Sequence, residues 1–251
     1  MKKRNLILVI IGIILLIVVT NVTIRYSNIR SVNFSVKYPT EDHIISLPEI
    51  QQSLAKRFGD LTQKKRREIS TEDIRVYLES KNFVSKADIA VTMLGKLNIV
   101  IYESEPIVRV YPKTGDDFYL DKDFHVLKVV ENHQSHTMIA TGDFPRVENL
   151  KVDSLKNILK SLYDLSTIIR NDSILKYQID QIDYHDTTFI LIPKIGDYSI
   201  ILGSKNNWED ELLRLHHLYK SSFTHSDWQQ YSKIDLRFSE QVVCTRKEDN
   251  K

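Results

Sequence analysis

The sequence predicts an α+β protein with a single N-terminal transmembrane helix and two folded regions after it. Three observations lead to this prediction. Residues 6–19 are apolar throughout except for Gly12. Residues 31–102 show the order strand, helix, helix, strand, strand, and from Pro106 onward short strands alternate with polar turns and a few helices. Periodicity of two indicates a strand with one buried face, and periodicity near 3.6 indicates an amphipathic helix.

The apolar run follows a short start that holds three basic residues. Extended to Ile24 it forms a helix about 28 Å long, which is enough to cross the hydrocarbon core of a bilayer. Basic residues ahead of such a run keep that end in the cytoplasm. A cleaved signal peptide is the competing interpretation, but no small-residue cleavage tripeptide follows the run. We therefore expect residues 1–5 in the cytoplasm, residues 6–24 in the membrane and the remainder outside it.

Charge and cysteine content narrow the class of protein. The 35 lysines and arginines nearly balance the 33 aspartates and glutamates, so the composition does not predict a nucleic-acid partner. Cys244 is the one cysteine, which rules out a disulfide within the chain. Stability must therefore come from packing.

The first folded region begins with apolar and polar residues alternating over 31–37, which predicts a strand. Ser46 as a cap and Pro48 in the first turn predict a helix over 47–58, which Gly59 ends. Apolar residues at helical spacing along this segment support the assignment.

A second capping sequence at Ser70 predicts a second helix, although a longer loop is the alternative at this place. Strands are expected over 87–93 and 97–102, joined at Gly95 and Lys96 as a hairpin. A small sheet with both helices on one face would bury the alternating apolar residues.

The second folded region is predicted to be rich in strands, with packed helices. The expected strands are 107–111, 118–120, 125–129, 138–141, 177–184, 188–192, 198–202, 233–238 and 241–245, and the expected helices are 154–165 and 208–219. The polar residues 246–251 are expected to form a flexible tail.

Several strings along the chain resemble, in order and spacing, the FtsQ/DivIB cell-division proteins of bacteria, most closely the versions from the Bacteroidota. These strings are Asn82-Phe83-Val84 with Ala87, the hairpin from Gly95 to Ile107, Phe118-Tyr119-Leu120-Asp121 with Asp123, Thr141-Gly142, and Ile234-Asp235-Leu236-Arg237-Phe238. Two positions depart from the family pattern. Ser104 stands where a basic residue is usual, which removes an ion pair at the domain junction, and Phe124 stands where a glycine is common, which leaves the turn type open.

The resemblance implies a POTRA domain over 25–104 and a strand-rich domain over 105–245. It also implies a non-catalytic scaffold of the cell inner membrane, a single-pass type II protein with its C-terminal domain in the periplasm at the division septum. The implied partners are FtsB-like and FtsL-like coiled-coil membrane proteins, bound through the strand-rich domain, and other division proteins, bound through the POTRA domain.

The partner site implied by the resemblance is the last strand and the residues before it. A strand at a sheet edge exposes unpaired N–H and C=O groups, so a partner segment can add to the sheet as a further strand. The predicted partner-binding residues are Arg237, Phe238, Ser239, Gln241, Val242, Val243 and Thr245. Phe238 stands at the family's aromatic anchor. The alternative is that Phe238 and Val242 fill the core, because strict alternation would put Phe238 on one face with Ile234 and Leu236.

An enzyme is the second class of hypothesis, and the sequence does not favour it. The histidine pairs His133/His136 and His216/His217, together with His225, lack the three or four converging ligands of a metal site. No nucleophile elbow, zinc-protease motif or glycine-rich phosphate loop occurs in the sequence. We predict no catalytic residue, no cofactor and no metal.

Two further sets of charged residues have ordinary explanations. The acidic pairs Asp116–Asp117 and Asp121/Asp123 fall in predicted turns, where aspartate favours local hydrogen bonds over glycan cleavage. The basic residues 64–67 lie about forty residues after the apolar run and could contact anionic lipid headgroups. A solvated loop is the simpler interpretation of that segment.

A third hypothesis keeps the POTRA domain and changes its task. A membrane-anchored adaptor or chaperone of envelope assembly would receive nascent strands through its own sheet edge. Such proteins carry several POTRA repeats or a membrane barrel, and the sequence shows neither a repeat of that length nor a series of amphipathic membrane strands.

Overall fold

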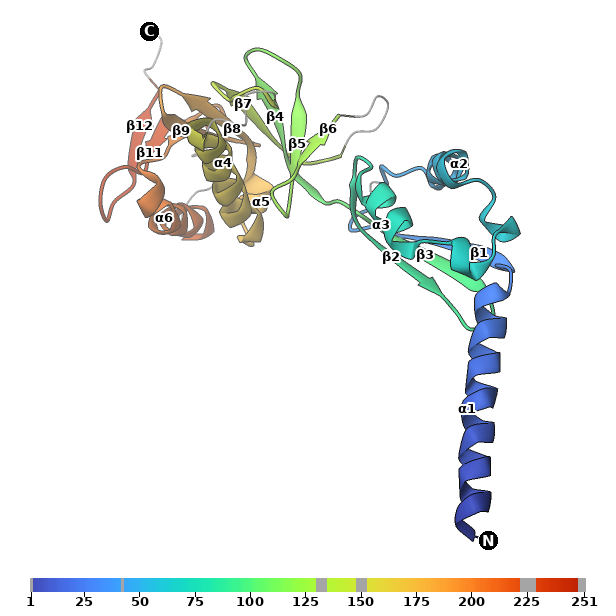
Figure 1. The fold of residues 1–251 in the computed structure, drawn as a ribbon. Coiled ribbons are helices and arrows are strands. Elements are labelled where there is room, and N and C mark those ends of the chain that lie inside the picture. Colours follow the sequence, from blue (N-terminus) through green and yellow to red (C-terminus); the bar gives the residue numbers. More distant parts are fainter. Residues whose placement is uncertain (1, 42, 130–134, 148–152, 222–228, 248–251) are drawn as a thin grey trace. The chain divides into compact units, whose positions relative to one another are not determined.

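The computed structural model describes residues 2–41, 43–129, 135–147, 153–221 and 229–247. The chain divides into two compact units, residues 1–104 and residues 105–251 (Figure 1). Each unit has its own sheet. Together they confirm the predicted α+β class.

Unit 1 begins with the long helix α1, Lys2–Tyr26. The large apolar side chains from Ile10 to Val19 are between 48% and 64% exposed. They point in all directions around the helix, so they do not pack on the rest of the unit.

Among the residues that the structure describes, no helix combines the length and the apolar character that crossing a membrane requires.

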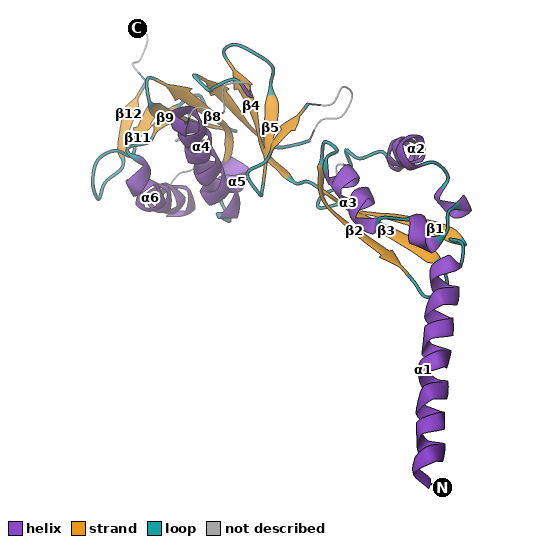
Figure 2. Cartoon of the chain, viewed as in Figure 1, coloured by secondary structure: helices purple, strands orange, loops and turns teal. Residues whose placement is uncertain are grey.

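A three-stranded sheet with two helices follows α1. The elements are β1 (Ser31–Lys37), α2 (Leu47–Phe58), α3 (Thr71–Glu79), β2 (Val84–Val91) and β3 (Lys96–Glu103). The central strand is β3, which pairs in parallel with β1 and antiparallel with β2. Both helices lie on one face of this sheet (Figure 2). The predicted order of elements is confirmed, and the second helix is a helix rather than a loop.

The ends of the two helices follow from local chemistry. Ser70 accepts a hydrogen bond from the backbone N of Asp73 at 3.1 Å, as the sequence predicted for a cap. Ser46 makes no such side-chain bond, and Pro48 in the first turn starts α2 instead. Gly59 ends α2 with a φ of 73°, a backbone conformation that a side chain disfavours.

A buried carboxylate holds the connection between β1 and α2. Oε2 of Glu103 accepts hydrogen bonds from the backbone N of Ile44 and Ile45 at 3.0 and 2.7 Å. The next residue, Ser104, is also buried, and its backbone N donates to the carbonyl of Phe83 at 2.8 Å. Unit 1 therefore closes with a small buried side chain at Ser104.

The basic segment before α3 is ordered by backbone bonds and is not a free loop. This basic segment, residues 64–67, lies between two short 3-10 turns: η1 (Leu61–Gln63) comes before it, and η2 (Arg66–Glu68) begins within it. The backbone N of Ile29 donates to the carbonyl of Lys64 at 3.0 Å, which ties the segment to the start of the sheet.

Unit 2 is built on a nine-stranded mixed sheet with the order β12-β11-β10-β9-β8-β7-β4-β5-β6. The pairs β4–β7, β7–β8 and β10–β11 are parallel, and the other five are antiparallel. The helices α4 and α6 lie on the same face of this sheet (Figure 2). The elements are β4 (Pro106–Pro112), β5 (Phe118–Asp121), β6 (Val126–Lys128), β7 (Met138–Gly142), α4 (Asp153–Asn171), α5 (Leu175–Gln178), β8 (Ile179–His185), β9 (Thr188–Pro193), β10 (Ser199–Ile201), η4 (Lys205–Asn207), α6 (Trp208–Ser221), β11 (Tyr231–Asp235) and β12 (Val243–Arg246).

The core of unit 2 lies between this sheet and its helices. Helix α4 is longer than predicted because Ile169 continues its buried apolar stripe past Leu165, and both are fully buried. The side chain of Leu155, which the sequence places on the same stripe, lies outside the described part. Other buried residues of the core include Val108, Leu120, Leu159, Leu162, Ile182, Leu191, Ile200, Leu212, Leu215, Ile234 and Leu236.

Several predicted strand boundaries in unit 2 are wrong. The strand expected from residue 177 begins at Ile179, because Oδ1 of Asp172 accepts from the backbone N of Ile174 and Leu175, both at 2.8 Å, and starts the helical turn α5. The strand expected to reach residue 238 ends at Asp235.

The last strand is β12, Val243–Arg246, and not 241–245, so Arg246 belongs to the sheet rather than to a tail. The backbone N of Lys247 also donates to the carbonyl of Gln230 at 2.8 Å. The rest of the predicted tail lies outside the described residues.

The turn after β5 keeps its form without a glycine. Phe124 adopts a φ of 63°, the left-handed conformation for which glycine is favoured. Its backbone N donates to the carbonyl of Asp121 at 3.1 Å, and its ring packs on Tyr163 with centroids 5.2 Å apart. The contact with the ring of Tyr163 offsets part of the strain of this conformation.

Candidate partner-binding edge

Strand β12 is the end of the nine-stranded sheet. It pairs antiparallel with β11, with Val243 opposite Asp235 and Cys244 opposite Ile234. Within the described residues, no strand pairs with its other side. Backbone groups of a strand point alternately to its two sides, so β12 presents N–H and C=O groups outward.

The side chains around β12 alternate between the core and solvent. Val242 and Cys244 are half-buried and pack against the core, whereas Val243 and Thr245 are exposed. Burial raises the pKa of the Cys244 thiol, so the thiol is protonated at neutral pH and is a poor nucleophile. One face of the strand thus belongs to the core and the other is open.

Phe238 lies outside both strands, and its side chain is 46% exposed. Strand β11 ends at Asp235, and the backbone N of the next residue, Leu236, donates to the carbonyl of Ile201 at 3.0 Å. After Leu236 the chain leaves the sheet, so the alternation of Ile234 and Leu236 does not extend to Phe238. The alternative that Phe238 fills the core is wrong, although Val242 does contact the core.

Arg214 of α6 fixes the connection between β11 and β12. Its Nη2 donates to the carbonyl of Leu236 at 3.0 Å, and its Nη1 donates to the carbonyls of Phe238, at 2.9 Å, and of Gln241. Glu240, with a φ of 59°, turns the chain between the last two. The guanidinium therefore bonds three backbone carbonyls of the connection, while the ring of Phe238 stays exposed.

An ion pair between Arg237 and Asp235 holds the start of the connection. Both Nε and Nη2 of Arg237 donate to the carboxylate of Asp235, at 2.9 and 2.6 Å. These bonds lower the pKa of Asp235 and raise that of Arg237. Nearby, Glu211 accepts from the backbone N of Gly203 at 2.8 Å, and burial raises the pKa of its carboxyl.

The predicted partner-binding residues lie together at this end of the sheet. Six of them are exposed, and Val242 is half-buried. No sequence pattern singles out Arg214, because an arginine four residues after Asp210 is typical of an ordinary helix-surface pair. Its three carbonyl partners lie 22 to 27 residues further along the chain, beyond the reach of a local pattern.

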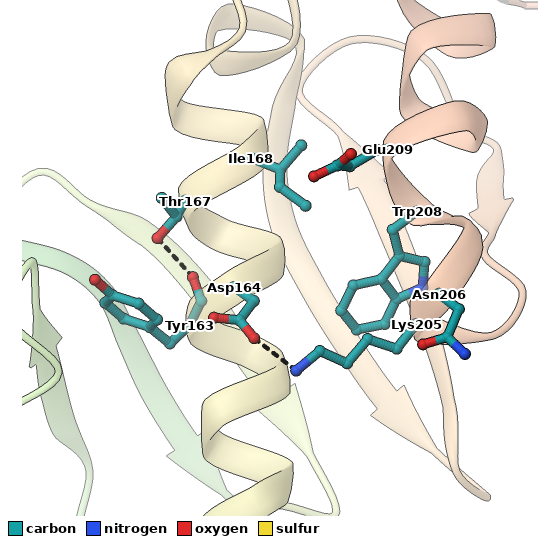
Figure 3. Close-up of a pocket in the computed structure, with 8 residues that line it drawn as sticks. All are labelled: Tyr163, Asp164, Thr167, Ile168, Lys205, Asn206, Trp208 and Glu209. Carbon is teal, nitrogen blue, oxygen red and sulfur yellow. Dashed lines mark hydrogen bonds and ion pairs between the residues drawn. The ribbon is translucent and has the colours of Figure 1, made fainter.

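An open cavity of about 490 Å³ lies apart from this edge, between α4 and the start of α6 (Figure 3). Nζ of Lys205 donates to Oδ2 of Asp164 at 2.5 Å across its mouth, and the hydroxyl of Thr167 donates to the carbonyl of Tyr163 at 2.7 Å. The indole N–H of Trp208 donates to the carbonyl of Gly203 at 3.2 Å. The side chains of Lys205, Asp164, Thr167 and Trp208 therefore bond to the protein itself.

Asp121, one of the acidic residues considered for an enzyme, serves local structure. Oδ1 of Asp121 accepts from the backbone N of Asp123 and His125, at 2.9 and 2.7 Å. The ligand atoms of these three residues lie within 4.8 Å of one another, but this carboxylate is already occupied by its turn.

Two other candidate residues are paired in a similar way. Asp117 accepts from Nε of Arg109 at 2.8 Å, and Nδ1 of His216 lies 2.8 Å from Oδ2 of Asp172. His133 and His225 lie outside the described residues.

These features define a class of protein: an α+β chain whose large mixed sheet ends in an open strand beside an exposed aromatic. A family model described as "FtsQ/DivIB, C-terminal related" matches residues 105–245, which is more than half of the chain. The chain belongs to the FtsQ/DivIB family. No curated protein matches it. Membership assigns the chain to the cell-division proteins, which are generally non-catalytic scaffolds that act at the septum with other division proteins.

Proposed function

We propose that this protein is a scaffold of the bacterial divisome that binds FtsB-like and FtsL-like membrane proteins through β12. The open edge of β12 carries this proposal, since it lies at the end of the sheet within the family-matched region. An extended partner segment would pair with the outward backbone groups of β12. Val243 and Phe238 would supply exposed apolar contacts beside it.

The bonds of Arg214 support a preformed site. A flexible connection would lose conformational entropy when a partner ordered it, and this loss weakens binding. Here the carbonyls of Leu236, Phe238 and Gln241 are already held by one side chain. The partner therefore meets an ordered surface in which an aromatic anchor is already exposed, the kind of residue that often dominates interface energetics.

The proposal extends to unit 1 and the membrane. We propose that unit 1 from residue 25 is a POTRA domain that contacts other division proteins; its order of strand, helix, helix, strand, strand supports this proposal. We further propose that the apolar residues 6–24 of α1 anchor the chain in the inner membrane as a single-pass type II protein. The apolar side chains of α1 exposed on all sides support an apolar environment for this helix.

Substitutions at the edge test the partner site. Val243→Asp places a charge where the partner strand would lie, and Phe238→Ala removes the anchor. We expect both full-length variants to lose co-purification of the FtsB-like and FtsL-like proteins while keeping the circular dichroism of the parent. Matched controls are Ile195→Asp and Tyr177→Ala, which alter exposed apolar residues elsewhere in unit 2 and should retain the partners. Retention of partners by both edge variants would refute the proposed site.

Depletion in the native cell tests the role itself. Loss of a divisome scaffold should give long undivided cells, and a fluorescent fusion should localise at midcell. Normal division with a defect in envelope assembly would instead favour an adaptor or chaperone.

A further inference from the structure

The residues just after α1 bond to the basic segment of unit 1. The backbone N of Arg66 donates to the carbonyl of Ser27 at 3.0 Å, and the backbone N of Ile29 donates to the carbonyl of Lys64 at 3.0 Å. The guanidinium of Arg67 lies over the ring of Tyr26, 4.4 Å from its centroid. The basic segment therefore lies directly beside the end of α1.

The turn between β2 and β3 lies at the same place. The backbone N of Arg30 donates to the carbonyl of Gly95 at 2.9 Å, and Nη2 of Arg66 donates to the carbonyl of Val91 at 2.9 Å. A Cβ on Gly95 would lie 3.0 Å from the carbonyl oxygen of Asn28. Three segments that are far apart in the sequence thus meet at the end of α1.

The side chains exposed there are of two kinds. Met93 and Leu94, at the tip of the turn, are 78% and 70% exposed, which is more than any other large apolar residue described. The basic side chains around them are also exposed. We call this surface the base of unit 1, and its exposed members are Tyr26, Arg30, Lys65, Arg67, Met93, Leu94 and Lys96.

The charge of the base is strongly positive. Glu68 is the one acidic residue between residues 61 and 70. Its Oε1 lies 3.9 Å from Nε of Arg67, which is a loose, exposed ion pair. Its Oε2 accepts from the backbone N of Lys65 at 3.1 Å. Four exposed basic side chains against one exposed carboxylate leave an excess of positive charge around two exposed apolar tips.

We propose that the base of unit 1 docks on a bilayer surface that carries anionic phospholipids. The arginine and lysine side chains would contact lipid phosphates, and Met93 and Leu94 would enter the boundary between headgroups and acyl chains. The inference rests on the proposed anchoring of α1. It favours lipid over a protein partner because the base includes Tyr26, the last residue of the apolar helix α1, and the next residue, Ser27, is bonded to Arg66.

Docking would give unit 1 a fixed orientation toward the membrane. Arg66 has a positioning role in this arrangement, since its bonds to Ser27 and Val91 join the end of α1 to the turn that carries Met93 and Leu94. Helix α1 and the base of unit 1 would then contact the same membrane at two places, and each contact would favour the other.

Fluorescence quenching in nanodiscs tests the proposal on the full-length chain. Cys244→Ser removes the native cysteine, and single cysteines at Leu94, Ile14 and Lys86 carry a bimane label. Lys86 is a control on the same sheet, about 20 Å up the strand from the turn. The nanodiscs contain either phosphatidylcholine alone or an equal mixture with phosphatidylglycerol, each with a headgroup-labelled or acyl-labelled spin lipid as quencher.

We expect the label at Ile14 to be quenched in both lipids, and the label at Leu94 to be quenched several-fold more in the anionic mixture than in phosphatidylcholine. The label at Lys86 should stay unquenched. Equal quenching at Leu94 and Lys86 in the anionic mixture, with Ile14 quenched, would overturn the docking and leave the anchor intact. An unquenched Ile14 would overturn the anchor and the docking together, while partner binding at β12 is tested independently by co-purification.

A charge reversal sharpens the test. In the Leu94-labelled protein, Lys65→Glu should abolish the excess quenching caused by the anionic lipid. Lys86→Glu makes the same charge change at an exposed position away from the base and should leave that quenching unchanged. The proposal is overturned if both reversals have the same effect, because total charge rather than the base would then control the contact.

Discussion

Strands β11 and β12 form one antiparallel pair and have opposite surroundings. Ile234 and Leu236, in and just after β11, are fully buried, and Asp235 is 3% exposed. In β12, by contrast, Cys244 alone is half-buried and the other residues are exposed. The difference shows that β11 contributes to the core of unit 2, whereas the outer side of β12 is exposed. Substitutions in β11 should affect folding, and substitutions on the outer side of β12 should affect binding.

The largest effect is expected at Leu236. Leu236→Ala leaves a cavity in the core and should lower the free energy of unfolding by about 2–5 kcal/mol, as measured by denaturant titration. Val243→Ala removes an apolar side chain of similar kind from the exposed strand and should change that free energy by less than about 0.5 kcal/mol. Equal losses in the two variants would mean that β12 is as buried as β11.

The next effect is expected at Arg214, whose side chain is 16% exposed. Arg214→Gln removes charged donors from three carbonyls and should cost about 2 kcal/mol of unfolding free energy. It should also speed proteolytic cleavage within residues 237–241. Lys220→Gln, a basic substitution at the exposed end of the same helix, is the control and should alter neither measurement. Unchanged cleavage in Arg214→Gln would show that the connection is held by other contacts.

Acid should weaken the start of the connection. The bonds from Arg237 lower the folded-state pKa of Asp235 below its ordinary value of 3.8. A lowered carboxyl pKa stabilises the fold above the unfolded value, and this contribution is lost as the pH falls through the folded value. Asp235→Asn should therefore flatten the decline in stability below about pH 4. If parent and variant lost stability in parallel over that range, the Asp235–Arg237 pair would contribute nothing to the acid limb.

A small effect on stability is expected at Phe238. Phe238→Ala should lower the free energy of unfolding by less than about 1 kcal/mol, because the ring is nearly half exposed. Phe118→Ala, at a residue that is 1% exposed, is the matched aromatic control and should cost about 3–5 kcal/mol. A cost at Phe238 as large as at Phe118 would restore the interpretation that Phe238 belongs to the core.

Local patterns predicted much of the fold. Helix α2 begins and ends where Pro48 and Gly59 indicate, and the hairpin of β2 and β3 turns at Gly95. The information for these elements lies within a few neighbouring residues, so the sequence carries it directly.

Elements decided by distant contacts were not predictable. The connection after β11 is bonded by Arg214, whose partner Leu236 lies 22 residues further along the chain. The start of β8, by contrast, follows from local bonds of Asp172 that the strand prediction did not take into account. For the candidate site, the resemblance supplied the residues and the physics of edge strands supplied the mode of binding. The exposure of Phe238 could not be predicted, since strict alternation assumes that a strand continues, and tertiary contacts ended this one.

Amide hydrogen exchange across β11 and β12 tests the open edge most directly. The full-length protein would be compared alone and with the extracytoplasmic segment of an FtsB-like partner. We predict that the outward-facing amides of β12, those not bonded to β11, exchange readily in the free protein and are strongly slowed by the partner, while the amides of Ile234 and Asp235 are slow in both. Outward-facing amides of β12 that are slow in the free protein, or that keep exchanging at the same rate with the partner bound, would contradict strand addition at this edge.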